Sequence, residues 1–313
     1  MTLPPDPNRP PPAGRPGAHP PPYRGRREYC YADGVSMLLA AHGHDVSSDL
    51  VEALSGVGLG AILLPGDILV LGQVPPDVGV DHALQRLGFD VRVERDGTGD
   101  AAWRRLAELL PRGPVLLGPV DYSALHYHLF RPPAGVDHYV VGYAIEDDHL
   151  LLHDPGGYPH VRLDRDTLLA AWRAEEIDYR RGSYQLWHSP ERVRTPEVGA
   201  TALAAFRADY EHTSGAPWPT GAAALRAGAD HLTKTTVERL VGFELPLAAA
   251  RAGNYAEFFR SHDRPEAAGM CDRQAQQFGR AYCAASAGDL TELARLLHRL
   301  ADLEEELTAH LLA

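Results

Sequence analysis

The sequence contains few cysteines. Only three occur among its 313 residues, namely Cys30, Cys271 and Cys283, so a disulfide framework is excluded and a reducing cytoplasm is the simplest compartment. No apolar run reaches the roughly 18–20 residues that a membrane-spanning helix needs. Residues 1–22 also lack the apolar core of a signal peptide. We therefore expect a cytoplasmic protein that has no membrane partner.

An excess of positive charge is also absent. The formal net charge is −12 at pH 7, and Lys and Arg form no dense run. Because nucleic acids and anionic membranes attract basic surfaces, neither is an expected partner. The content of 44% hydrophobic and 23% charged residues is that of a soluble globular protein.

The pattern of the chain changes twice. Residues 1–22 are Pro-rich and of low complexity, which predicts a disordered arm. Residues 23–190 mix helical periodicities with short strand signals, and from 191 to 313 Ala-rich helical patterns replace the strands. The sequence therefore predicts an α+β fold, in which a domain with an antiparallel sheet precedes an all-helical domain.

Cys30 is the first candidate for a reactive residue, because it opens a helix predicted over residues 30–41. The unpaired N–H groups and the dipole of a helix N-terminus stabilise a thiolate. The same groups are suited to bind the oxyanion of an acyl intermediate. Gly34 lies one turn further on, and we expect it to keep this face of the helix open to substrate.

His138 and Asp154 complete a possible triad, since each lies at the end of a predicted strand, over 138–145 and 149–153. His138 would act as the base and Asp154 would orient its imidazole. In a hairpin centred on Glu146 the two residues would be cross-strand partners, with Cβ atoms about 4.5–5.5 Å apart. A helix cysteine followed by a strand histidine and a strand aspartate is the chain order of papain-like thiol enzymes.

Other readings of these residues remain open. The many histidines between 126 and 160, including His126, His128, His153 and His160, would suit a zinc or iron site. Cys271 and Cys283 fit buried or incidental positions. The leucines spaced along the predicted last helix, from Leu293 to Leu307, indicate either a core face or a homodimer interface.

Several stretches resemble the butirosin biosynthesis protein H family. They are residues 30–44 (CYADGVSMLLAAHGH), 56–60 (GVGLG), 135–143 (GVDHYVVGY), 153–158 (HDPGGY) and the region from 221 onward. The resemblance implies a papain-like fold, related to the double-glycine leader peptidases, over residues 23–190, with a helical domain over 191–313. It also implies acyl transfer from an acyl carrier protein thioester to a small-molecule amine acceptor in bacterial antibiotic biosynthesis, a branch of secondary metabolism.

On this resemblance Cys30 would take the acyl group, and Asp121 and Tyr122 would line the substrate pocket. The implied reaction needs no cofactor and no metal. Leader peptidases carry a Gln before the cysteine as an oxyanion donor, and residues 23–29 (YRGRREY) contain none, which leaves Arg24, Arg26, Arg27 or backbone N–H groups for that role. A chain-releasing cyclase, a leader-type peptidase and a non-catalytic binding protein are the alternatives.

Overall fold

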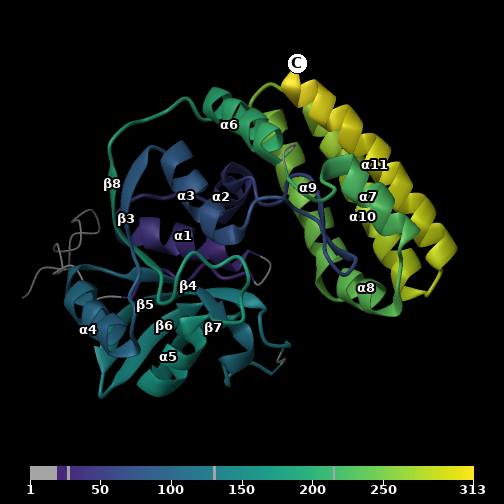
Figure 1. Cartoon of the computed structure of the whole chain (residues 1–313). Coiled ribbons are helices and arrows are strands. Elements are labelled where there is room, and N and C mark those ends of the chain that lie inside the picture. The colour runs from purple at the N-terminus through teal and green to yellow at the C-terminus, as the bar shows by residue number, and fades with distance from the viewer. Residues whose placement is uncertain (1–19, 27–28, 130–131, 214–215) are drawn as a thin grey trace, which may run out of the picture.

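The computed structural model describes residues 20–26, 29–129, 132–213 and 216–313. They form two lobes, one built around a sheet and one of helices (Figure 1). The predicted α+β class is thereby confirmed. Most of the predicted N-terminal arm lies outside the described residues, but Pro21 is buried, and its carbonyl accepts a hydrogen bond from His153 Nε2 at 2.9 Å.

A six-stranded sheet forms the centre of the first lobe, and all its neighbouring strands are antiparallel. Its central strands are the apolar segments that the sequence marks as strands, because residues buried on both faces of a sheet read as continuous apolar runs. In spatial order the strands are β3 (Phe89–Glu94), β8 (Leu186–Arg192), β4 (Val115–Asp121), β5 (Asp137–Glu146), β6 (His149–Asp154) and β7 (Tyr158–Asp164).

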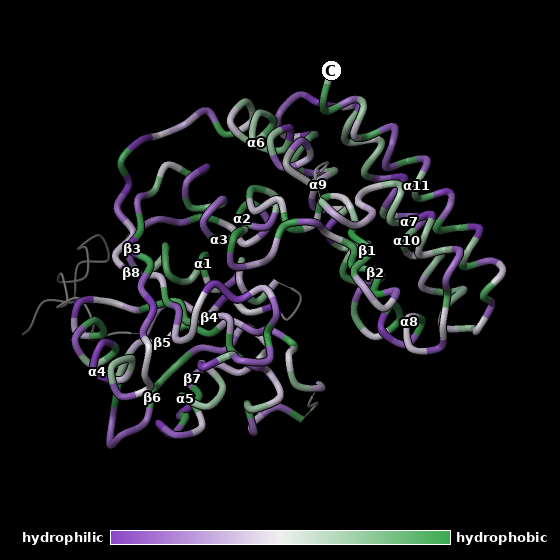
Figure 2. The backbone as a smooth tube through the Cα atoms, viewed as in Figure 1, coloured by the Kyte–Doolittle hydropathy of each residue, from purple (hydrophilic) through white to green (hydrophobic). Residues whose placement is uncertain are grey.

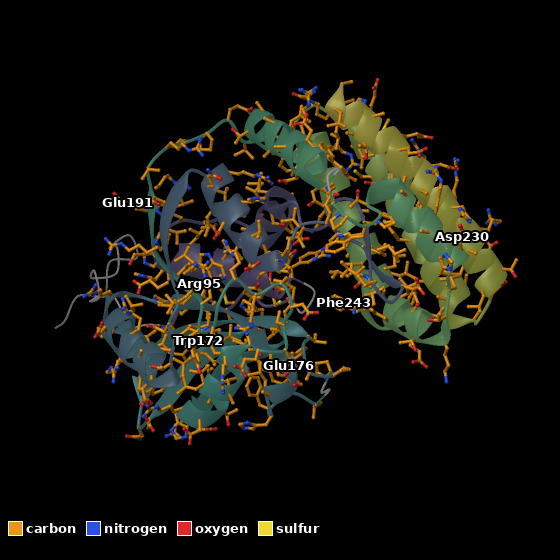
Figure 3. All side chains as sticks on the ribbon, in the orientation of Figure 1. Arg95, Trp172, Glu176, Glu191, Asp230 and Phe243 are labelled. Atoms are coloured by element: carbon orange, nitrogen blue, oxygen red, sulfur yellow. The ribbon has the colours of Figure 1, made fainter. Side chains whose placement is uncertain are left out.

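Helices cover both faces of this sheet. Alternate residues of a strand point to opposite faces, so Tyr139 and Val141 of β5 join the core beneath α1 (Cys30–Ala41), α2 (Ser48–Ser55) and α3 (Pro76–Arg86). Val140 joins the opposite core, beneath α4 (Gly99–Leu109) and α5 (Arg165–Arg173). Trp172 of α5, labelled in Figure 3, is fully buried there, and its indole N–H donates to the Gln185 carbonyl at 2.7 Å.

The second lobe consists of helices after the last strand of the sheet. They are α6 (Val198–Thr213), α7 (Gly221–Asp230), α8 (Lys234–Arg239), a π-helical turn (Leu240–Glu244), α9 (Leu245–Ser261), α10 (Pro265–Ser286) and α11 (Leu290–Leu312). Hydrophobic and hydrophilic residues alternate along α10 and α11 (Figure 2). The leucines of α11 from Leu293 to Leu307 are buried inside the chain itself, so they form a core face and give no support to a homodimer.

A short hairpin from the first part of the chain packs in the helical lobe. Strands β1 (Ile62–Leu64) and β2 (Ile68–Val70) pair with each other and stand outside the main sheet. Leu63 and Leu69 are buried in the core of the helical lobe, together with residues of α7, α9, α10 and α11. The helical lobe therefore includes a segment from the first quarter of the sequence. Within the described ranges, every helix is too short or too polar to cross a lipid bilayer.

Candidate active site

Cys30 lies at the N-terminus of α1, as the sequence predicts, and is half-buried. The helix begins at the predicted residue and ends at Ala41, two residues before Gly43, whose φ of +82° glycine adopts readily. Tyr29 is the N-cap, and its side chain makes no capping hydrogen bond. The first N–H groups of α1 therefore meet no capping side chain among the described residues and are suited to a bound oxyanion.

Hydrogen bonds to α1 and to the residues after it hold the segment that leads into α1. Asp33, buried in the first turn, accepts a hydrogen bond from the backbone N–H of Arg26 at 2.8 Å. The Arg24 guanidinium binds Asp45 at 2.7 Å, and that of Arg26 binds Asp49 at 3.0 Å. Both guanidinium groups are thus already paired with carboxylates, so neither is available as the oxyanion donor. Arg27, the third arginine considered, lies outside the described residues.

His138 and Asp154 form a buried pair. The imidazole Nε2 of His138 lies 2.7 Å from Asp154 Oδ1. Cys30 and His138 lie close enough for each to shift the pKa of the other, and because Nε2 is engaged with the carboxylate, Nδ1 is the ring nitrogen that can take the thiol proton. The three predicted catalytic residues therefore come together as a cysteine–histidine–aspartate chain.

The predicted reason for the contact between His138 and Asp154 is wrong, however. The hairpin turns at Asp147 and Asp148, which both have positive φ, rather than being centred on residue 146. A register shift between Gly142 and Ala144 then changes the pairing by one residue. Continued from there, the register sets Asp154 opposite Val140, so it is a diagonal neighbour of His138 on the same face. Without that shift, the two side chains would point to opposite faces.

The electrostatics of the site favour charge on the imidazole. Burial alone would lower the pKa of His138, but the Asp154 carboxylate and the Cys30 thiolate outweigh it and raise this pKa well above its usual value. Burial raises the pKa of Cys30, and a protonated His138 opposes that rise. The two groups titrate as a coupled pair, in which the thiolate forms when His138 carries the proton.

Asp154 is held from several sides at once. Four groups donate to its carboxylate at 2.6–2.7 Å: His138 Nε2, His128 Nε2, the Tyr127 hydroxyl and the Gly156 backbone N–H. Burial would raise the pKa of this carboxyl, but the two imidazoles hold it well below its usual range. Asp154 is therefore ionised and fixed in position, as an orienting carboxylate requires.

The ring of His138 is supported by an aromatic side chain. Tyr122 stacks on it with centroids 4.5 Å apart and an interplanar angle of 12°. The Tyr122 hydroxyl donates to Nδ1 of His128 at 2.9 Å, which leaves the Nε2–H of His128 to donate to Asp154. Tyr122 thus belongs to the site, but it positions the base, whereas the sequence suggested a role in substrate binding.

Asp121 and Gly34, also predicted to contact substrate, both make contacts that support the fold. The carboxylate of Asp121 accepts from the backbone N–H and the hydroxyl of Ser123, at 2.9 and 2.6 Å, and caps the turn after β4. Gly34 faces the sheet, where a Cβ would lie 2.5 Å from Leu116 Cδ1. Gly34 therefore allows α1 to approach β4 closely, and the expectation that it opens a substrate pocket is wrong.

Asp137 adds a second carboxylate near the nucleophile. It precedes His138 in β5 and is only partly buried. Burial raises the pKa of Asp137, and the nearby Tyr179 hydroxyl opposes that rise. Its negative charge in turn raises the pKa of Cys30. Asp137 thus works against thiolate formation, whereas the sequence offered it only as a possible metal ligand beside His138.

The histidines considered as metal ligands separate into two groups. His128 joins His138 and Asp154, with one ligand atom from each within 4.8 Å of the others. His153 and His160 instead contact each other on the far side of the hairpin, with ring centroids 4.6 Å apart. The first group has the right residue types for zinc, although its nitrogens already share the carboxylate at hydrogen-bonding distance. Sequence reasoning identified His128 as a ligand candidate but missed its bond to Asp154.

Comparison with known proteins gives one consistent result. The profile of the YobF C-terminal domain family matches residues 215–312, which correspond to the helical lobe from just before α7 to the end of α11. The chain is 32% identical, over 301 residues, to a protein of Bacillus subtilis (strain 168) named "Uncharacterized protein YobF". The aligned region covers 93% of this chain and 98% of that protein. The chain belongs to the YobF family. The similarity to YobF extends over both lobes, so it includes the segments that carry Cys30, His138 and Asp154.

Proposed function

We propose that this YobF-family protein is a cysteine-dependent acyltransferase with a papain-like catalytic lobe. The observation that carries the proposal is the buried His138–Asp154 pair beside a cysteine at an uncapped helix N-terminus. These residues can form a thiolate on Cys30 that accepts an acyl group. The N–H groups at the helix N-terminus can stabilise the oxyanion of the intermediate that forms on the way. The acyl donor is a carrier-protein thioester and the acceptor is a small-molecule amine, as the resemblance to the butirosin biosynthesis protein H family implies.

In the first half-reaction, His138 Nδ1 takes the thiol proton of Cys30, and the thiolate attacks the thioester carbonyl. The negative charge on the carbonyl oxygen is stabilised by the first N–H groups of α1. Collapse of this intermediate breaks the bond to the carrier sulfur, which leaves with the proton from His138. The product is an acyl-Cys30 thioester and a free carrier thiol.

In the second half-reaction, the amine attacks the acyl-Cys30 carbonyl and gives up a proton to His138. The C–S bond then breaks, the amide leaves, and Cys30 recovers its proton. Asp154 stabilises the imidazolium during both steps and fixes its tautomer. A thioester donor fits this site better than a peptide bond, because it is already activated and residues 23–29 supply no Gln as an oxyanion donor.

The proposal is tested by incubating the protein with acyl thioesters of N-acetylcysteamine or of a phosphopantetheinylated carrier, and measuring its intact mass. The exposed Cys283 could be acylated without catalysis, so the test uses a Cys283→Ser background. We expect a single acyl adduct that Cys30→Ala abolishes and that an added amine removes as an amide. An adduct that survives in Cys30→Ala, or none with any thioester, would refute the proposal.

Other uses of the same residues appear as distinct outcomes of this experiment. Loss of the adduct without an added amine, as a ring-closed product, would indicate the chain-releasing cyclase. Cleavage of leader peptides without a carrier would indicate the peptidase. The cluster of His128, His138 and Asp154 favours a metal enzyme as the second candidate. Stoichiometric zinc or iron in the purified protein, bound through His128, would support that reading over acyl transfer.

A further inference from the structure

The two reactive residues are each followed by a tyrosine, and these two tyrosines touch. Tyr31 comes directly after Cys30 in α1, and Tyr139 comes directly after His138 in β5. Their rings meet edge to face, with centroids 6.1 Å apart and an interplanar angle of 73°. Both rings are buried. The contact therefore joins the helix that carries the nucleophile to the strand that carries the base, one residue away from each.

The helical lobe hydrogen-bonds to one of these two tyrosines, Tyr31. Arg251 of α9 donates from Nη2 to the Tyr31 hydroxyl at 3.0 Å and from Nε to Glu52 Oε1 at 2.8 Å. The Tyr31 hydroxyl itself donates to the other oxygen of Glu52, so the three groups form a closed triangle. All three side chains are at least nine-tenths buried. A buried charged network of this kind is strongly sensitive to the loss of any member.

The backbone leaves little space for Arg251 or Tyr139 to move. A Cβ on Gly58 would lie 2.6 Å from Arg251 Cδ, and one on Gly118 would lie 2.2 Å from the Tyr139 ring. The main chain therefore passes close to both side chains at positions occupied by glycine. Tyr139 is further confined by Trp187, whose ring centroid is 6.2 Å away. Because close-packed groups transmit displacement, a shift of Arg251 would reach the first turn of α1.

We propose that Arg251 of the helical lobe is a positioning residue for the thiol–imidazole pair. By holding the Tyr31 hydroxyl, it fixes the first turn of α1 and the ring against which Tyr139 packs. The separation of Cys30 from His138 thus depends on a side chain of the helical lobe, which makes that lobe part of the active site. This inference rests on the thiol chemistry proposed above.

A matched control exists in a second buried ion pair between the lobes. Arg86 of α3 donates to Asp209 of α6 at 2.7 Å and to the Leu54 carbonyl at 2.8 Å. In the described part of the chain, the hydrogen bonds of Arg86 go to Asp209, Leu54 and His82 and not to Tyr31 or Tyr139. Arg251→Met and Arg86→Met each leave one buried carboxylate without its arginine, so both should lower the stability of the contact between the lobes. Only Arg251→Met should disturb the reactive pair.

The experiment measures the rate of Cys30 alkylation by iodoacetamide, followed by mass spectrometry in the full-length Cys283→Ser protein. Rates are collected between about pH 5 and 9, which covers the ordinary pKa values of His and Cys. We expect Cys30 of the wild-type background to react through the thiolate that forms when His138 carries the proton. Arg251→Met should lower the rate at neutral pH about tenfold and move the rise of the profile to higher pH. Tyr31→Phe should lower it about threefold, because it removes the hydroxyl that accepts from Arg251 and donates to Glu52.

Two further variants separate positioning from folding. Arg251→Lys keeps the charge beside Glu52 and should restore part of the rate, whereas Arg86→Met should keep the wild-type profile despite a lower melting temperature. The inference is overturned if Tyr31→Phe and Arg251→Lys, both folded, keep the wild-type profile, or if Arg86→Met shifts it equally. If Cys30 of the parent protein shows no thiolate reactivity over this pH range, the proposed function fails, and this inference fails with it for that separate reason.

Discussion

Asp154→Asn is the substitution whose effect the site geometry defines most closely. The carboxylate accepts four hydrogen bonds, two on each oxygen: His138 Nε2 and the Gly156 N–H on Oδ1, and His128 Nε2 and the Tyr127 hydroxyl on Oδ2. An amide of the same shape has only one acceptor oxygen. Its NH₂ group must therefore face two donors, and the negative charge that stabilises the imidazolium is lost.

The size of the effect follows from these contacts. A hydrogen bond to a charged group contributes about 1.5–3 kcal/mol, which corresponds to a factor of about 10 to 150 in the population of the thiolate–imidazolium pair. The two donors left without an acceptor cost about 1–3 kcal/mol each in the free energy of unfolding. We therefore expect Asp154→Asn to alkylate at Cys30 about 10- to 150-fold more slowly at neutral pH and to unfold at a clearly lower urea concentration.

The assay combines iodoacetamide kinetics in the Cys283→Ser background with urea unfolding monitored by circular dichroism. Asp209→Asn is the control, since it makes the same chemical change at a buried aspartate that pairs with Arg86 in the contact between the lobes. Asp209→Asn should lower stability and leave the rate of alkylation unchanged. A wild-type rate in folded Asp154→Asn would refute the role of Asp154 as the orienting group.

Three other outcomes are expected. Because the negative charge of Asp137 raises the pKa of Cys30, Asp137→Asn should move the alkylation profile to lower pH, and a shift to higher pH would contradict this electrostatic reading. Gly118→Ala should lower the unfolding free energy by about 1–3 kcal/mol, because the new Cβ overpacks against Tyr139. Gly253→Ala in α9 is the control: its new Cβ has no neighbouring atom within 4 Å, so in the same urea titration it should be neutral or stabilising. Since the pKa of Asp154 is held well below its ordinary 3.8, its ionised form stabilises the fold above that value. The unfolding free energy should therefore fall as the pH drops below about 4, by less in Asp154→Asn.

The elements that the sequence predicted well are those with local signals. α1 begins at Cys30 and ends at Ala41 as expected, because helical spacing and a following glycine mark both limits. The strands predicted over 138–145 and 149–153 match β5 and β6 to within one residue at each end. The limits of β8 are instead set by its pairing with β3 and β4 rather than by its own residues.

The grouping of Cys30, His138 and Asp154 was predictable from residue type and order, whereas the contacts that support it were not. The positions of Cys30, His138 and Asp154 follow from elements that the local pattern identifies. The register shift in β5 that aligns His138 with Asp154 lies beside Gly142, but a glycine within a strand indicates either a bulge or a close backbone approach and does not fix the register. The bonds from His128 and Tyr127 to Asp154 come from a loop whose path depends on the assembled sheet. Long-range geometry of this kind cannot be predicted from one sequence.

The hairpin of β1 and β2 has a consequence for how the protein is made. Residues 61–71 leave the ribosome long before the helices whose core they complete, the last of which ends at Leu312. Until those helices are made, Leu63 and Leu69 have no apolar core in which to be buried. The nascent chain must therefore keep this exposed segment from pairing with other strands. A truncated protein that stops after the sheet would expose the same segment permanently. We therefore expect such a fragment to aggregate and to bind chaperones, even though its sheet is intact.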